Sequence, residues 1–368
     1  MSRKLLSYTA IGLILGSTAI ADVPKVAVDI APVHSLVSRV MEGVGSPKLI
    51  IPAGASPHEY SLRPSEAKSL QDADIVIWMG EDLAPWMENS IETLSKNAEV
   101  ITLLEESSTK LLDFREGALF EEHDHGEHDD HDDHDDHDDH DEHDHDKDHD
   151  DHDDHDDHGH DKDHDDHDDH DKDHGDHDDH DKDHDDHDDH GDHDGHAHGE
   201  HDPHAWLSIE NAQTWLNLVA GKLSAADPDN AGVYFANAAA AREEINDLVK
   251  EVDSILEPVR GRNFVVFHDA YQYFETSFDF PAAGAISLGD ATDPSAARIA
   301  EIQDRVKDEG INCVLSEPQY NANLVATVLS GTDAKTGVID PLGLGLEPGS
   351  KLYGDLIRNM AKALAGCL

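Results

Sequence analysis

The sequence predicts an α/β protein of two βα lobes, each with a mainly parallel sheet, joined by one long rigid helix. Short runs rich in Val, Ile and Phe alternate with helical segments, and such alternation implies parallel strands covered by helices. The alternation occurs once before and once after a stretch of histidine and aspartate. A helical pattern over 228–256 separates the two halves, and at about 1.5 Å per residue it would exceed roughly 40 Å and could cross between two lobes.

In the first half, glycine and proline mark the ends of the elements. Gly43 ends a helical stretch, Pro64 opens the next one, and Gly80 follows a buried apolar strand. The expected strands cover 26–30, 48–51, 74–79 and 100–103, and the expected helices cover 34–42, 65–71 and 85–95.

The second half repeats this arrangement after two helices. One helix is expected over 208–223 with Glu210 in its first turn, and Pro228 and Pro258 bound the long one. Beyond it, the expected strands cover 264–267, 280–286, 313–315 and 337–339, and the expected helices cover 294–309, 322–329 and 349–364.

The charge of the chain is concentrated in one segment. The 368 residues carry a formal net charge of −57, but positions 121–202 alone hold 44 acidic residues, 4 lysines and 27 of the 31 histidines. That segment carries −40 and the rest of the chain −17. No part of the chain could neutralise phosphates, which excludes a nucleic-acid partner.

The segment 121–202 repeats His-Asp-Asp and contains no aliphatic residue except Ala197. It has nothing to bury, so it is expected to be disordered without metal. One interpretation is a solvated polyanion that keeps the protein soluble. The other is a low-affinity zinc trap, because a histidine at every third place supplies many imidazole ligands. Protonation of the imidazoles below about pH 6 would weaken such capture.

The N-terminus has the pattern of a secretory signal peptide over 1–21, with two basic residues before an apolar stretch and small residues at the cleavage site. A single membrane anchor is the alternative, but glycines interrupt the run and no basic segment follows it. The predicted product is a monomer in the periplasm. Its expected parts are a first lobe over 22–225 with the insertion at 121–202, a linking helix over 226–258 and a second lobe over 259–368.

Two cysteines, Cys313 and Cys367, lie far apart in the chain. In an oxidising compartment such a pair predicts a disulfide, which would stabilise the fold by roughly 2–4 kcal/mol. Two free buried thiols and a zinc site that uses both cysteines are the alternatives.

Four histidines lie outside the insertion: His34, His58, His204 and His268. His58 lies in a turn-rich loop after a strand, and His204 lies just ahead of a helix. His268 directly follows a buried strand, where open α/β sheets place their ligands. Three imidazoles from both halves could converge on one site between the lobes, and three imidazoles with one open position suit Zn²⁺.

Each of these histidines also has a simpler interpretation. His58 could be a solvated loop residue, His204 the last member of the His/Asp-rich segment, and His268 a residue that caps a backbone group. His34 begins a helix and is expected to cap or pack locally rather than to bind metal.

The segments around the three histidines resemble the periplasmic zinc-binding proteins of bacterial ABC-type zinc importers. The resemblance covers essentially the whole chain after the signal peptide, including a His/Asp-rich insertion at this place. It lies in 54–65 (Gly-Ala-Ser-Pro-His-Glu-Tyr-Ser-Leu-Arg-Pro-Ser), 203–208 (Pro-His-Ala-Trp-Leu-Ser), 266–271 (Val-Phe-His-Asp-Ala-Tyr), 273–275 (Tyr-Phe-Glu), 317–319 (Glu-Pro-Gln) and 340–343 (Asp-Pro-Leu-Gly).

The resemblance implies two α/β lobes bridged by a rigid helix, with the zinc ion held in the cleft by His58, His204 and His268. It also implies a disulfide between Cys313 and Cys367, an ABC-type zinc permease in the inner membrane as partner, and no enzymatic activity.

The chain departs from the family pattern at Pro57, where some members with a zinc role have a carboxylate. The fourth coordination position is therefore left to water, Glu59 or Asp340. Related manganese- or iron-binding proteins replace one histidine with a carboxylate, so His204 and His268 favour zinc.

Three functions follow from these patterns. The favoured one is capture of Zn²⁺ and its delivery to a permease. A zinc hydrolase with Glu59 as base is disfavoured, since no His-Glu-x-x-His pattern is present. A periplasmic metal store or a surface adhesin is the third.

Overall fold

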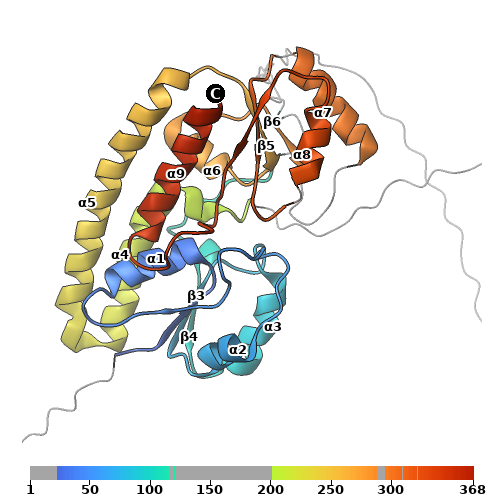
Figure 1. The fold of residues 1–368 in the computed structure, drawn as a ribbon. Coiled ribbons are helices and arrows are strands. Elements are labelled where there is room, and N and C mark those ends of the chain that lie inside the picture. Colours follow the sequence, from blue (N-terminus) through green and yellow to red (C-terminus); the bar gives the residue numbers. More distant parts are fainter. Residues whose placement is uncertain (1–22, 116–119, 121–200, 288–294, 309, 321) are drawn as a thin grey trace, which may run out of the picture. The chain divides into compact units, whose positions relative to one another are not determined.

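The computed structural model describes residues 23–115, 120, 201–287, 295–308, 310–320 and 322–368 (Figure 1). The predicted signal peptide and all of the predicted insertion except its last two residues lie outside these ranges. Two sheets of four strands each, all parallel and covered by helices, confirm the predicted α/β class.

The first sheet is formed by short apolar strands whose side chains are buried on both faces at its centre. Such strands suit a parallel sheet with helices on its faces. The strand order is β2 (Lys48–Leu49), β1 (Val26–Val28), β3 (Ile75–Trp78) and β4 (Glu99–Thr102), and the helices are α1 (Ala31–Val40), α2 (Pro64–Gln71) and α3 (Pro85–Leu94).

The second sheet has the same strand order as the first. In each sheet, the strand that comes first in the chain lies between the second and the third. The chain therefore continues to one side of this strand first and later to the other side. Ligands of open α/β sheets bind at the carboxyl ends of strands at such a point. The order is β6 (Gly284–Ser287), β5 (Phe264–His268), β7 (Cys313–Ser316) and β8 (Lys335–Val338), with helices α6 (Gln272–Phe278), α7 (Ala296–Asp308), α8 (Ala322–Val328) and α9 (Leu352–Cys367).

Two helices separate the sheets along the chain, α4 (Ile209–Ala226) and α5 (Ala231–Leu256). The Ser208 hydroxyl accepts a hydrogen bond from the Asn211 amide and caps α4. The 26 residues of α5 make it about 39 Å long. It packs against α4, against α1 of the first half and against α9 of the second half (Figure 1).

Four of the elements differ from the sequence expectation in presence or bounds. Helix α6 is additional to the expected elements, and strand β6 is confined to 284–287. The last helix begins at Leu352 and not at Gly349, whose φ of 151° is a glycine conformation outside the helical region. Helix α1 begins at Ala31, because the proline at its second position suits a first turn.

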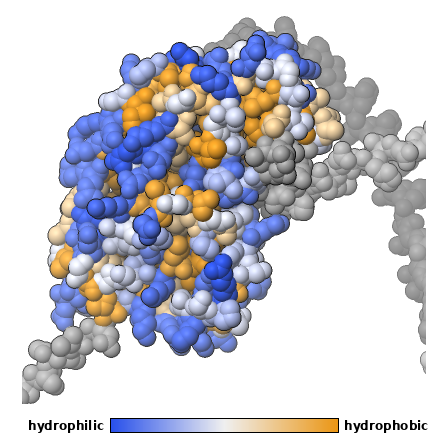
Figure 2. Space-filling view, in the orientation of Figure 1, coloured by the Kyte–Doolittle hydropathy of each residue, from blue (hydrophilic) through white to orange (hydrophobic). Residues whose placement is uncertain are grey.

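The interior of the described residues forms two apolar clusters. Strand β5 contributes to both, since Phe264 and Val266 point into the larger cluster and Val265 and Phe267 into the smaller one. Polar residues cover much of the face shown in Figure 2, with apolar patches between them. Within the described ranges, no helix has both the length and the hydropathy that a membrane span requires.

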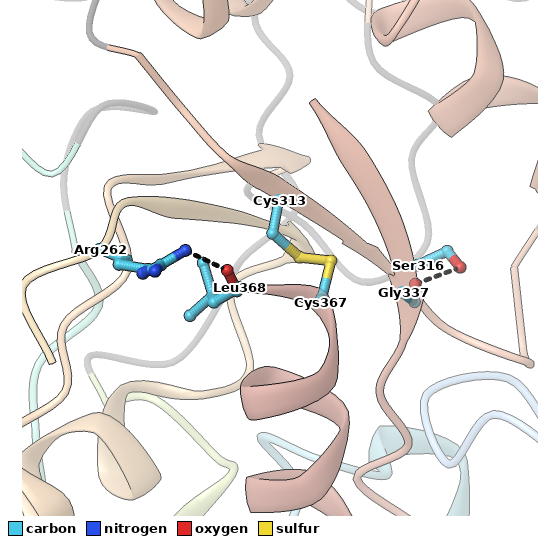
Figure 3. The surroundings of a disulfide bond; sticks show 6 residues. All are labelled: Arg262, Cys313, Ser316, Gly337, Cys367 and Leu368. Carbon is cyan, nitrogen blue, oxygen red and sulfur yellow. Dashed lines mark hydrogen bonds between the residues drawn. A yellow bond between two sulfur atoms is a disulfide. The ribbon is translucent and has the colours of Figure 1, made fainter. Parts of the chain in front are cut away.

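A disulfide joins Cys313, at the start of β7, to Cys367, at the end of α9 (Figure 3). This confirms the predicted disulfide, and neither cysteine is free. The Arg262 guanidinium donates a hydrogen bond to the Leu368 main-chain oxygen next to it. The C-terminal helix is thereby held to the second sheet at its last turn.

The carboxylate of Asp29 links the carboxyl ends of β1 and β3. It accepts hydrogen bonds from the amides of Ile30 (2.7 Å) and Met79 (2.6 Å) and is fully buried. Burial raises the pKa of Asp29 to about 7, although the amide hydrogen bonds oppose this shift. The folded chain thus holds this proton over a pH range in which the unfolded chain has lost it.

We expect Asp29→Asn to change how stability depends on pH. The parent's Asp29 favours folding most below about pH 4, and this contribution is lost as the pH rises through about 7. Relative to the Asn variant, the parent should therefore lose about 1–3 kcal/mol of unfolding free energy between pH 5 and pH 8. Denaturant titrations at both values measure the difference, with exposed Asp229→Asn as control. A difference that is independent of pH would contradict the prediction.

Candidate metal centre

His58 lies in the loop that follows β2. The indole nitrogen of Trp86, on α3, donates a hydrogen bond of 2.8 Å to the Pro57 carbonyl and holds the loop beside the first sheet. His58 is half-buried, whereas the neighbouring Glu59 is exposed. Only the histidine of this pair therefore lies at the inner side of the loop.

His204 is buried and oriented by Asp202. The Asp202 carboxylate accepts a hydrogen bond from the His204 amide (2.9 Å) and lies 2.7 Å from Nδ1 of the same histidine. The Tyr273 hydroxyl donates to the Asp202 carbonyl at 3.0 Å. Asp202, the last residue of the predicted insertion, is 1% exposed and packs beside His204.

A β-bridge just before His204 joins the two sides of the predicted insertion. His201 pairs with Asp113 in an antiparallel bridge, and its Nδ1 lies 2.9 Å from the Asp113 carboxylate. The Asp202 amide donates to the Leu112 carbonyl at 2.8 Å. This bridge fixes the chain that leads into His204.

His268 is the last residue of β5, and its Nδ1 lies 2.5 Å from an oxygen of Glu317. Glu317 follows β7, the strand that pairs with β5, so the parallel register brings the two side chains together. Both are buried. His204 and His268 therefore share one arrangement, an imidazole whose Nδ1 faces a buried carboxylate.

The three predicted histidines lie next to one another. The ring centroids of His58 and His204 are 5.7 Å apart, and those of His204 and His268 are 5.3 Å apart. They line one cavity of about 20 Å³, which is room for one water-sized group. Among the described residues, no group of three His, Cys, Asp or Glu side chains is already arranged to hold a metal ion. Binding would require the rings to shift toward one another.

Two carboxylates, Glu59 and Asp340, are the protein side chains that the sequence predicts as possible fourth ligands. Glu59 is exposed and does not line the cavity. Asp340 organises its own loop, since one carboxylate oxygen accepts from the Leu342 amide at 3.0 Å and the other from the Leu344 amide. Neither carboxylate is among the residues that line the cavity of the three histidines.

His34 packs locally, as expected. It lies in α1, is 7% exposed, and its Nε2 lies 3.3 Å from the Pro47 carbonyl. Its Nδ1 lies 3.4 Å from the Ser38 hydroxyl. Burial lowers the pKa of His34 below the ordinary histidine value.

A buried ion network lies beside His268. The Arg115 guanidinium hydrogen-bonds both oxygens of Asp269, the residue after His268, and donates to Glu275 at 2.7 Å. It also lies 3.5 Å from the ring centroid of Phe120. Burial raises the pKa of Asp269 to about 6, although the guanidinium acts against this shift. The network ties the segment just before the insertion to the end of β5.

The sequence alone does not single out the residues that orient the histidines. Asp202 lies within the predicted His/Asp-rich segment, and Glu317 is part of a family motif. The signal for Glu317 is its place directly after a buried strand, which matches that of His268.

Comparison with known proteins gives a family match over nearly the whole chain. Residues 26–367 match the family described as zinc-uptake complex component A, periplasmic. The high-affinity zinc uptake system protein ZnuA of Paracoccus denitrificans is 44% identical over 358 residues, covering 96% of this chain and 95% of its own. The protein of that name from Brucella abortus (strain 2308) is 42% identical over 353 residues, covering 96% and 94%.

Solved structures share the fold. A crystal structure of ZnuA matches with a TM-score of 0.64 at 17% identity, covering 94% of this chain and 99% of that one. The SBP FpvC from Pseudomonas aeruginosa, in complex with Mn²⁺, matches with a TM-score of 0.65 at 17% identity, covering 94% and 98%. With the family match across nearly the whole chain, the protein belongs to the family of periplasmic zinc-uptake components represented by ZnuA.

Proposed function

We propose that this protein is a periplasmic solute-binding protein that captures Zn²⁺ and delivers it to an ABC-type permease. His58, His204 and His268 are the proposed ligands. The observation that carries the proposal is their position around one small cavity, with ring centroids 5.3 and 5.7 Å apart. The zinc-uptake names of the relatives at 42–44% identity support the same cargo.

The buried carboxylates support metal binding by the same rings. A metal-bound histidine generally presents its other ring N–H to a carboxylate or carbonyl, which fixes the tautomer and makes the ligand more basic. Asp202 and Glu317 lie at Nδ1 of His204 and His268, respectively. In this proposal, Nε2 of each of the two rings is the atom that binds the zinc ion.

The ligand set favours zinc over manganese. Imidazole nitrogens suit Zn²⁺, whereas Mn²⁺ prefers carboxylate, carbonyl and water oxygens. The similar FpvC structure contains Mn²⁺, so the fold alone does not select the metal. In this chain the selection rests on three imidazoles and on carboxylates that face ring nitrogens.

The His/Asp-rich segment has a second role in this proposal. Its histidines would collect zinc at many weak sites, while the cavity holds one ion tightly. Delivery of the zinc ion requires that one ligand move away from it. His58 is the proposed mobile ligand, because it is the least buried of the three histidines and lies in a loop.

Zinc titration of metal-free protein tests the proposal. The parent should show one tight site together with weak ones, and His268→Ala should weaken the tight site by at least about 100-fold. His34→Asn, which replaces a histidine that does not line the cavity, is the matched control. Deletion of 121–200 should remove the weak sites and keep the tight one. Absence of a tight site in the parent, or its survival in His268→Ala, would refute the assignment.

A further inference from the structure

The side chain of Gln319 connects two loops that meet at the metal cavity. Its amide nitrogen donates to the Ala53 carbonyl at 3.3 Å and to a carboxylate oxygen of Asp340 at 3.1 Å. Ala53 lies in the loop that bears His58, and Asp340 lies in the loop after β8. Both partners are acceptors, so they fix which end of the amide is the nitrogen.

Because the amide nitrogen makes these two hydrogen bonds, the other polar atom of the Gln319 amide is the oxygen Oε1, which can only accept a hydrogen bond. This Oε1 atom is buried and has no hydrogen-bond donor among the described residues. Gln319 lines the same cavity as the three histidines. A buried acceptor without a donor costs free energy, so a donor that arrives with the cargo would be stabilised at this position.

Zinc would bring such a donor. Three imidazoles leave one of the four usual zinc positions open, and this position commonly holds water. Glu59 is exposed, and the Asp340 carboxylate already accepts from Leu342 and Leu344. Water is then the fourth ligand that leaves these contacts intact. Zinc-bound water is more acidic than free water and is a strong hydrogen-bond donor.

We infer that Gln319 is a positioning residue for the proposed zinc site, whose Oε1 accepts a hydrogen bond from the zinc-bound water. The inference rests on the proposed function and adds a residue to it. The same amide holds the loop of His58 through Ala53. Gln319 thus couples the fourth coordination position to the loop that carries the first histidine ligand.

Gln319→Met tests this role, because methionine has similar length but no strong hydrogen-bond acceptor. The zinc dissociation constant should rise about 10-fold, as for other residues that support metal ligands. In the Co²⁺-loaded variant, the visible d–d bands should shift relative to those of the parent. Thiocyanate donates no hydrogen bond to Gln319, so it should displace the metal-bound water of the variant at a lower concentration than that of the parent. Gln213→Met, on α4 and outside the cavity, is the matched control, since it also removes an amide that hydrogen-bonds a side chain.

The outcomes separate a positioning role from a structural one. Parent-like cobalt bands and thiocyanate affinity in Gln319→Met would overturn the inference, even if the denaturation midpoint of the metal-free variant fell. If the parent itself binds no zinc tightly, the proposed function fails. Tight binding by the parent with no change in Gln319→Met overturns only the role of Gln319.

Discussion

Replacing Arg115 with methionine should lower the free energy of unfolding by about 3–5 kcal/mol near neutral pH. Arg115 is the cation that faces both Asp269 and Glu275, and these two carboxylates are 5% exposed each. Without the guanidinium, two buried negative charges would remain close together. Loss of one partner from a buried ion pair is costly because the charge left behind has neither water nor a counterion.

Denaturant titrations of parent and Arg115→Met measure this effect, with the exposed Arg63→Met as control. The loss should shrink as the pH falls from neutral toward about 6, because the pKa of Asp269 is about 6 in the parent and higher without the cation, so the carboxyl takes up a proton first in the variant. A loss below about 1 kcal/mol at neutral pH would show that the network is not important for stability. Zinc affinity should also fall, since Asp269 follows His268 directly.

Removing the disulfide should destabilise the protein by about 4 kcal/mol. Cys313 and Cys367 are 54 positions apart, and cross-linking a loop of this length restricts the unfolded chain by about that free energy. The double variant Cys313→Ser, Cys367→Ser should unfold at lower denaturant concentration than the parent. A thiol reductant should lower the midpoint of the parent and leave that of the double variant unchanged. Equal midpoints without reductant would contradict the prediction.

The elements that the sequence predicted well are those with a strong apolar pattern. Strands β3 and β5 are continuous buried runs, and the 26-residue helix α5 has apolar side chains at helical spacing. Helix α6 is not predictable from its local sequence, because three of its seven residues are aromatics, which are enriched in strands. Its conformation depends on packing of Tyr273 and Phe274 in the larger core, which no local pattern encodes.

The site was predictable in part for a related reason. The three histidines can be distinguished from those of the insertion, because each lies in a loop or at the end of a strand in the predicted fold. Asp202 could not be distinguished by composition, because it directly continues a segment full of aspartate. Glu317 lies 49 positions from His268, and only the pairing of β5 with β7 brings them to 2.5 Å. Gln319 contacts two loops that are remote from it in sequence, at Ala53 and Asp340, and no local pattern encodes these contacts.

The bridge between Asp113 and His201 bears on how many repeats the chain can carry. It joins residues 88 positions apart, one on each side of the His-Asp-Asp repeats. Doubling or halving the length of a chain loop changes its closure free energy by only about 0.6 kcal/mol. His-Asp-Asp units can therefore be added or removed at little cost in the free energy of folding.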